Sequence, residues 1–301
     1  MKTAFCTIST NSHLFKVDTL FESLKNQGCS SELICLATQT GTDTIKNGRL
    51  LRPNEIDLGE TGRAIRKKHN KTSDHLRWSL KPVLIRALLE KYDKVIYLDN
   101  DLFFVGNPSF LWEDLEQSDV LLTPHHYPRS PKTNQNWLEA NFKVGLYNAG
   151  FIAVNKKAIS VIDWWAECCL YRCEKSLIRG LFDDQKYLDL FPIIHPNTKV
   201  LEHRGCNVAG WNTDVCERTV NTDGTISICD KWPLIFVHFN GFSVRSIIHG
   251  GDVSLKPYLD NYVEALQNFK PSLELGELWN ENTLWDRLKL WAWRFLDRFG
   301  K

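Results

Sequence analysis

Two carboxylates stand one residue apart in the segment Asp99-Asn100-Asp101, directly after the apolar run Val95–Leu98. Side chains alternate along a strand, so the two aspartates point to the same side. Two like charges this close raise each other's pKa unless a cation lies near them. Carboxylate oxygens suit Mg²⁺ or Mn²⁺, bound together with a diphosphate. The spacing therefore predicts a divalent metal site at Asp99 and Asp101.

A third metal ligand is indicated at His238, which ends a second apolar run. A neutral imidazole there can complete the coordination of a cation that two aspartates hold. A lone histidine on an apolar strand is more often a core residue, and that alternative stays open. Gly241 follows three residues later and lets the backbone approach a phosphate closely, which favours the ligand role.

The chain as a whole has the composition of a globular protein. It has 301 residues, of which 43% are hydrophobic, and this length suits one large core. The 37 basic and 36 acidic residues give a net charge of +1, so nothing attracts polyanions globally and no nucleic-acid partner is expected. The nine cysteines match no metal-binding spacing and predict reduced thiols. No apolar leader or membrane-spanning run is evident, which predicts a cytoplasmic location.

Alternating strand and helix patterns position the candidate ligands. Strands are expected over residues 4–8, 32–37 and 94–98, with helices around 14–24 and 78–91 between them. This order predicts an α/β protein with a parallel, doubly wound sheet, whose ligands bind beyond the carboxyl ends of the strands. Both Thr7–Asn11 and Asp99–Asp101 fall at that edge. Later strands are expected over 120–123, 150–154 and 234–239, and a helix over 159–169.

Three further features carry local expectations. Residues 59–73 are basic and poor in apolar side chains, which predicts a mobile loop. Pro82 interrupts the helix that follows and is expected within its first turn. Trp137 and Trp211 lie in loop-like sequence, and they are either stacking surfaces for an acceptor sugar or core residues.

Four motifs recur in an order that resembles a known family: Tyr97-Leu98-Asp99-Asn100-Asp101, Tyr147-Asn148-Ala149-Gly150-Phe151, Asp184-Gln185, and His238-Phe239-Asn240-Gly241. Together they resemble the nucleotide-sugar-dependent glycosyltransferases of the GT-A fold, of the retaining family-8 (galactosyltransferase/glycogenin-like) type. The resemblance covers about the first 245 residues. It implies a Rossmann-like, mostly parallel sheet flanked by helices, with a catalytic domain over 1–250 and a C-terminal helical appendage over 251–301.

The resemblance also implies an activity and a set of site residues. The activity is transfer of a hexose, with retention, from a nucleotide diphosphate sugar such as UDP-sugar to a glycan or lipid-linked acceptor in surface-glycan assembly. Mn²⁺ or Mg²⁺ would be held by Asp99, Asp101 and His238, and Asp184 and Gln185 would be catalytic. The residues that would bind the substrate are Thr7, Ser9, Thr10, Lys81, Asn100, Asn148, Ala149 and Gly241.

The sequence departs from the family pattern at one point and leaves two other functions open. The Lys-Pro-Trp element that follows His-x-x-Gly in the family is missing, so Arg245 and Lys256 are alternative sources of positive charge for the diphosphate. The segment 205–212 is a candidate to face the acceptor. A phosphohydrolase built on the aspartate pair remains an alternative, although Phe103 stands where dehalogenase-like phosphatases carry Thr or Val. A non-catalytic sugar-nucleotide or glycan-binding module is the other alternative.

Residues 281–301 have the pattern of an amphipathic helix. Its apolar residues recur every three or four positions, and basic residues outnumber acidic ones five to three. Tryptophan with Arg and Lys on such a helix is typical of a segment that lies in a membrane interface. Docking of the same face on the domain or on a partner subunit stays open. The first interpretation predicts peripheral contact with the inner face of the cell membrane.

Overall fold

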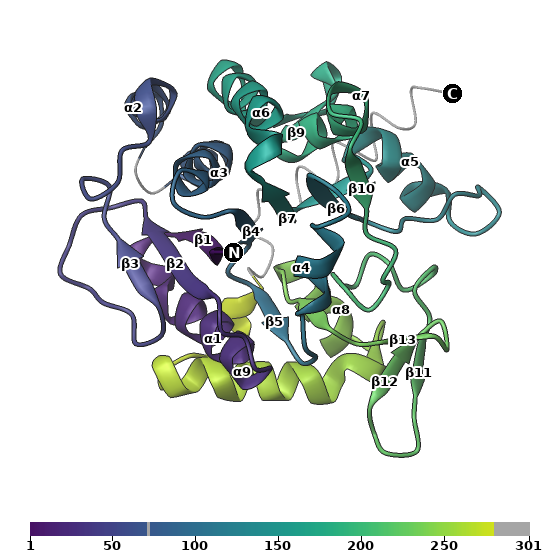
Figure 1. The fold of residues 1–301 in the computed structure, drawn as a ribbon. Helices are drawn as coiled ribbons and strands as arrows, with labels where there is room; N and C mark the ends of the chain where they lie inside the picture. Colours follow the sequence, from purple (N-terminus) through teal and green to yellow (C-terminus); the bar gives the residue numbers. More distant parts are fainter. Residues whose placement is uncertain (71–72, 280–301) are drawn as a thin grey trace.

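The computed structural model describes residues 1–70 and 73–279, and a seven-stranded sheet forms its centre (Figure 1). The strand order is β10-β6-β7-β4-β1-β2-β3. β7 runs antiparallel to its neighbours β4 and β6, and every other pairing in this sheet is parallel. The predicted mainly parallel α/β sheet is confirmed. The strand bounds are β1 (Thr3–Ser9), β2 (Glu32–Ala37), β3 (Arg49–Leu51), β4 (Lys94–Leu98), β6 (Val120–Pro124), β7 (Tyr147–Asn155) and β10 (Thr198–Val200).

Helices cover both faces of this sheet, because alternate residues of its buried strands face opposite cores. In β1, Ala4 and Cys6 join a cluster with α2 (Gly59–Lys68), α3 (Asp74–Leu89) and α6 (Ile159–Tyr171). The intervening Phe5 joins a second cluster with α1 (Leu14–Asn26) and α4 (Phe110–Asp114). Figure 1 shows α2, α3 and α6 on one side of the sheet and α1 on the other.

A third cluster lies beside the main sheet and carries the strand that ends in His238. This strand, β14 (Phe236–His238), pairs antiparallel with β5 (Leu102–Phe104) instead of joining the seven-stranded sheet. The cluster combines residues 208–247 with residues 255–278, including α8 (Gly241–Ile248) and α9 (Lys256–Phe269). α9 also packs against α1. The domain boundary at residue 250 stays a prediction.

The other elements are short and lie at the edges of this architecture. A three-stranded sheet and a two-stranded sheet accompany the main one. The remaining bounds are α5 (Gln135–Lys143), α7 (Phe191–Ile194), β8 (Glu174–Ser176), β9 (Leu181–Asp183), β11 (Arg218–Val220), β12 (Ile226–Ile228) and β13 (Trp232–Pro233), with 3₁₀ helices that include η1 (Asn11–His13) and η4 (Gln185–Leu190).

The loop expected over residues 59–73 is wrong for residues 59–68, which form α2. This helix rests on α3 through a very narrow apolar side: Ile65 is fully buried, and a Cβ at Gly62 would lie 3.6 Å from the Val83 side chain. Its basic residues face outward. Only two of its ten residues are buried and most of the others are polar, which explains why the sequence suggests a loop.

The position expected for Pro82 is also wrong, since it is the ninth residue of α3 and not part of the first turn. Residues 80–85 are buried without a break, so α3 is packed on all sides at this level. Proline removes a backbone hydrogen bond and is unfavourable inside a helix. We infer that burial around the whole helix circumference outweighs this penalty.

Two expectations concern membranes and thiols. Within the described residues, no helix combines the length and the apolar character needed to cross a bilayer. The amphipathic helix expected over 281–301 lies outside the described residues. All nine cysteines are unpaired, as the sequence predicts.

Candidate active site

The two aspartates occupy a tight turn where β4 leaves the sheet. The Asp99 amide donates to the Gly150 carbonyl oxygen (2.8 Å), which extends the pairing of β4 with β7 by one residue. The Leu102 amide then donates to the Asp99 carbonyl oxygen (3.2 Å), and the chain enters β5. In the pairing of β5 with β14, Leu102 lies opposite His238. This register places His238 next to Asp99 and Asp101.

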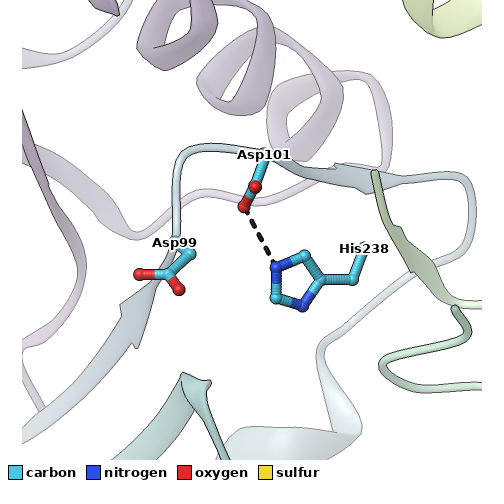
Figure 2. Close-up of side chains that lie close together, drawn as sticks. All are labelled: Asp99, Asp101 and His238. Carbon is cyan, nitrogen blue, oxygen red and sulfur yellow. Dashed lines mark ion pairs between the residues drawn. The ribbon is translucent and has the colours of Figure 1, made fainter. Parts of the chain in front are cut away.

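Asp99, Asp101 and His238 form one cluster, shown in Figure 2. Their candidate ligand atoms all lie within 4.8 Å of one another, and His238 Nε2 lies 3.1 Å from Asp101 Oδ1. The imidazole is 5% exposed, whereas the carboxylates of Asp99 and Asp101 are 31% and 24% exposed. The juxtaposition predicted for these three residues is therefore present, with the carboxylates on the open side.

Asn207 fixes the orientation of the His238 ring. Its Oδ1 lies 3.0 Å from His238 Nδ1. An amide oxygen only accepts hydrogen bonds, so Nδ1 donates to it, and Nε2 is the ring nitrogen that faces Asp101 and could bind a cation. Asn207 is fully buried and has a left-handed backbone conformation (φ +58°), which asparagine tolerates better than most residues. Sequence reasoning assigned this segment to the acceptor side and missed the role.

Gly150 keeps the cluster open. A Cβ added at this position would lie 2.7 Å from His238 Cε1 and 3.1 Å from Asp99 Oδ2. Any side chain would therefore fill the space between the imidazole and the carboxylate. Two carboxylates, one imidazole nitrogen and a cradle that only glycine leaves free fit a small divalent cation.

Lys81 lies beneath the cluster with its side chain 3% exposed. Its Nζ lies 3.1 Å from Asp99 Oδ1 and 3.3 Å from Asp184 Oδ2, and it donates to the Ala149 carbonyl oxygen (3.0 Å). Burial acts to lower the pKa of Lys81, but the carboxylates of Asp184 and Asp99 raise it above its usual value. Lys81 is therefore a permanently charged contact between Asp99 and Asp184.

Asp184 is almost completely buried, and burial raises its pKa to about 7 although Lys81 acts in the opposite direction. Its carbonyl oxygen accepts a hydrogen bond from Trp165 Nε1 (2.9 Å). Gln185 begins η4, and its Oε1 accepts from Asn148 Nδ2 (3.2 Å) and from the Ala149 amide (3.1 Å). The predicted residues Lys81, Asn148, Ala149, Asp184 and Gln185 thus form one hydrogen-bonded and ion-paired layer, called the floor below.

The residues expected at the end of β1 adjoin the aspartate turn. Asn100 Nδ2 donates to Ser9 Oγ (3.1 Å), and Ser9 Oγ donates to the Thr10 carbonyl oxygen (3.0 Å). Thr7 Oγ1 is buried without a hydrogen-bond partner among the described residues. Thr10 borders a cleft of about 430 Å³, whose other lining residues are Asn11, Ser12, His13, Gln39, Asp74 and Arg77.

The candidates after His238 lie on the outer surface. Gly241 is the exposed first residue of α8, and the Asn240 side chain caps this helix by accepting from the Ser243 amide (2.8 Å). Arg245, one turn later, is exposed. Lys256 is exposed on α9 and pairs with Asp260. In the described part of the chain, neither basic residue forms an ion pair with Asp99 or Asp101.

The two tryptophans occupy different surroundings. Trp211 is 5% exposed, with its ring centroid 5.2 Å from that of His238, so the core alternative is favoured for it. Trp137 lies in α5, which makes the loop expected there wrong, and its ring stacks on Tyr127 at 5.1 Å. The Asn134 side chain accepts from the Trp137 amide and starts this helix.

Comparisons with known proteins bear on this site. The sequence profile of Glycosyl transferase family 8 matches residues 47–174. The chain is 30% identical to the uncharacterised protein YfnF of Bacillus subtilis (strain 168) over 258 residues, which cover 82% of this chain and 84% of YfnF. It is 27% identical to YfnD of the same organism over 250 residues, which cover 80% of this chain and 78% of YfnD.

Solved structures share the fold. The galactosyltransferase LgtC, crystallised with donor and acceptor sugar analogues, superposes with a TM-score of 0.56 at 13% identity over 92% of this chain and 99% of LgtC. The glycosyltransferase GlyE of Streptococcus pneumoniae TIGR4 superposes with a TM-score of 0.50 at 16% identity over 90% of this chain and 64% of GlyE. The chain therefore belongs to glycosyl transferase family 8, and it is a glycosyltransferase with a GT-A fold.

Proposed function

We propose that this glycosyltransferase moves a hexose, with retention, from a UDP-sugar to a glycan or lipid-linked acceptor, and that it depends on a divalent cation. The observation that carries the proposal is the cluster of Asp99, Asp101 and His238 around the cradle at Gly150. It lies where β4 leaves a mainly parallel sheet, the edge at which such sheets bind ligands. Residues 1–250 are proposed as the catalytic unit.

Asp99, Asp101 and His238 would hold Mn²⁺ or Mg²⁺. When bound, the cation would stabilise the negative charge that develops on the departing diphosphate. With this charge neutralised, departure of the diphosphate needs no general acid. Asp99 Oδ1 is occupied by Lys81 and by the Tyr97 hydroxyl (3.0 Å), so Oδ2, toward Gly150, is the oxygen available for a cation. Asp99 Oδ2 and His238 Nε2 are thus two ligand atoms whose positions the protein fixes before a cation binds.

The floor would orient the donor sugar. Glycosyl transfer passes through an oxocarbenium-like state, and its sugar must be held in register with the leaving group. Gln185 and Asn148 are fixed by each other and by the backbone of β7, so their remaining hydrogen-bonding capacity points in a defined direction. We assign donor-sugar contact to Asn148, Asp184 and Gln185, and nucleotide contact to the loop from Thr7 to Thr10.

Retention is supported by the state of the acidic side chains. An inverting enzyme needs a carboxylate that is free to accept the acceptor's proton. The Asp184 carboxyl is 2% exposed and ion-paired with Lys81, and Asp183 is 8% exposed and lies 3.4 Å from Lys175 Nζ. Neither carboxylate is therefore free to act as the base. A front-face reaction beside Gln185 needs no such group.

The acceptor and the location follow from the family resemblance. We propose an acceptor in surface-glycan assembly and a cytoplasmic protein with peripheral contact to the membrane. The phosphohydrolase and the non-catalytic module gain no support, because the chain belongs to a glycosyltransferase family.

Titration calorimetry with UDP, with and without Mn²⁺, tests the donor and the metal together. We expect UDP binding that requires Mn²⁺ and is abolished by a chelator, with GDP as the matched control nucleotide. A second assay follows release of UDP from a panel of UDP-hexoses. Mn²⁺-independent UDP binding would contradict the metal role, and release of UDP from none of the sugars would contradict the donor assignment.

A further inference from the structure

Two basic side chains that the motifs do not include lie beside the metal cluster. Lys16 belongs to the first turn of α1 and Arg77 to the first turn of α3. These helices pack in the clusters on opposite faces of the sheet. The charges of Lys16 and Arg77 act on Asp101 more strongly than any other group except His238. Both charges therefore lie near the candidate active site.

Neither cation is fully neutralised by the protein. Lys16 is half-buried and, among the described residues, forms no ion pair or hydrogen bond. Arg77 is 28% exposed and pairs through one terminal nitrogen with Asp74. Its Nε is buried without a hydrogen-bond partner among the described residues. A buried guanidinium nitrogen without a partner is unfavourable, which indicates a place for an acceptor that a ligand supplies.

The two cations also oppose each other. Burial lowers the pKa of Lys16, and the charge of Arg77 lowers it further, with only Asp101 acting in the other direction among its main neighbours. Burial lowers the pKa of His13 to about 4, helped by the charges of Lys16 and Arg77. Two partly buried like charges that act on the same histidine are costly unless an anion lies near them.

The neighbouring cleft has room for such an anion. Arg77 lines the cleft of about 430 Å³ that Thr10, Ser12 and His13 also border, next to the aspartate turn. An arginine presents several donors in a planar fork, and this geometry matches phosphate oxygens. Lysine adds a mobile point charge with three donors. Arg77 at this cleft and Lys16, three residues after the cleft residue His13, thus supply the chemistry of a phosphate-binding site.

We propose that Lys16 and Arg77 bind the diphosphate of the nucleotide sugar, in the role for which the sequence offers Arg245 or Lys256. This inference rests on the proposed function, because it assigns the charged part of the same donor. Arg245 is exposed on α8, and Lys256 is exposed on α9 and paired with Asp260. The cations from α1 and α3 would therefore contact the leaving group together with the metal ligands.

The test measures Mn²⁺-dependent binding of UDP, uridine and inorganic pyrophosphate to the wild type and five variants by calorimetry. K16Q and R77Q each remove one charge and keep a polar side chain, and R77K keeps the charge without the fork. R245Q and K256Q are the matched controls. We expect K16Q and R77Q to weaken UDP and pyrophosphate binding by at least about tenfold and to leave uridine binding unchanged. R77K should recover part of the loss, and the controls should bind like the wild type.

Several results would overturn the assignment. They are wild-type affinity for UDP and pyrophosphate in K16Q and R77Q, loss in R245Q or K256Q instead, or no binding of either diphosphate to the wild type. Thermal midpoints of all variants check that the fold is kept, and R77K serves if R77Q does not fold. The proposed function is judged separately, by release of UDP from UDP-hexoses. Diphosphate binding that needs Lys16 and Arg77 without sugar transfer would keep this inference and contradict that function.

Discussion

Asp99 and Asp101 are two residues apart in sequence but belong to different surroundings. Asp99 faces the floor, where Lys81 Nζ and the Tyr97 hydroxyl both contact its Oδ1. Asp101 pairs with His238 and faces Lys16 and Arg77, which we call the wall. In the floor, the buried cation is shared by two protein carboxylates. In the wall, Lys16 forms no ion pair within the described part of the chain, and Arg77 pairs with Asp74 alone.

This difference separates two tasks that one site has to perform. A floor whose side chains are already paired with one another holds its geometry before any ligand arrives, which is what positioning a reacting sugar requires. A wall with charge in excess is incomplete until an anion binds, which favours capture of a diphosphate and its stabilisation as charge develops. The predictions below test whether the two sides are separable in this way.

The largest effect is expected at Asp101, a candidate metal ligand on which both the floor and the wall depend. Asp101→Asn keeps the size of the side chain but removes the charge that faces His238 and the wall. We expect Mn²⁺-dependent UDP binding to fall by more than about 100-fold, because loss of a direct ligand exceeds the effect of an outer-shell change. Calorimetry measures the binding, and circular dichroism checks the fold. Unchanged UDP affinity with Mn²⁺ present would contradict the metal assignment.

Lys81→Met tests whether the floor is a closed unit. The change leaves the carboxyl of Asp184 buried without its cation, so we expect a loss of about 3–5 kcal/mol in the free energy of unfolding. Urea denaturation measures this loss. K81M/D184N should regain part of the stability, because the second change removes the stranded charge. Lys256→Met, at an exposed lysine, should change stability by less than about 0.5 kcal/mol. If Lys81→Met and Lys256→Met lower the free energy of unfolding equally, the ion pairs of Lys81 do not contribute to stability.

Gln185→Ala and Asp184→Asn separate the floor from nucleotide binding. We expect turnover to fall by about 100-fold, since groups that act on the transition state lower kcat. The affinity for UDP should stay within about threefold of the wild type, because UDP lacks the sugar that these residues contact. Steady-state kinetics and calorimetry give the two numbers. Collapse of UDP affinity with preserved turnover would instead place the pair in the nucleotide site.

Asn207→Gly is expected to have a smaller, more specific effect. It removes the oxygen that holds His238 Nδ1 but keeps the left-handed backbone conformation, which glycine adopts freely. We expect Mn²⁺ affinity to fall by about tenfold, the scale of an outer-shell change, with little change in stability. Asp230→Gly is the matched control, at an exposed position with φ +53°. If both variants bind Mn²⁺ like the wild type, Asn207 does not position the ligand.

Sequence reasoning found the parts of the site whose signal is local. Asp99 and Asp101 follow an apolar run directly, and His238 ends another, so each is visible as a polar residue at a strand end. Their meeting depends on the pairing of β5 with β14, which is encoded only in tertiary packing. The family resemblance supplied that link, together with the floor residues.

The residues that sequence reasoning missed share a different property. Asn207 looks like a turn residue, because its left-handed conformation and its contact with His238 arise only in the folded chain. Lys16 and Arg77 look like solvent-exposed helix charges. Their position in the first turns of α1 and α3 is a usable signal, since helix starts gather at the ligand-binding edge of a doubly wound sheet. The helix α2 was not predicted because its buried residues are only Gly62 and Ile65, and glycine has no side chain.

The smallest effect on the site itself is expected from removing the chain after Leu278. The third cluster has its last buried residue at Leu278, with Trp279 partly buried against it, and α9 packs against α1, so the shortened protein should fold and keep its UDP affinity. The removed sequence contains the predicted amphipathic helix over 281–301, with five basic and three acidic residues. We expect the full-length protein to sediment with anionic liposomes at low salt and the shortened one to stay in solution, because apolar burial and charge attraction add in such helices. Sedimentation with neutral liposomes is the control for charge. A full-length protein that stays in the supernatant would contradict the membrane interpretation. A shortened protein that unfolds would favour docking of this segment on the domain.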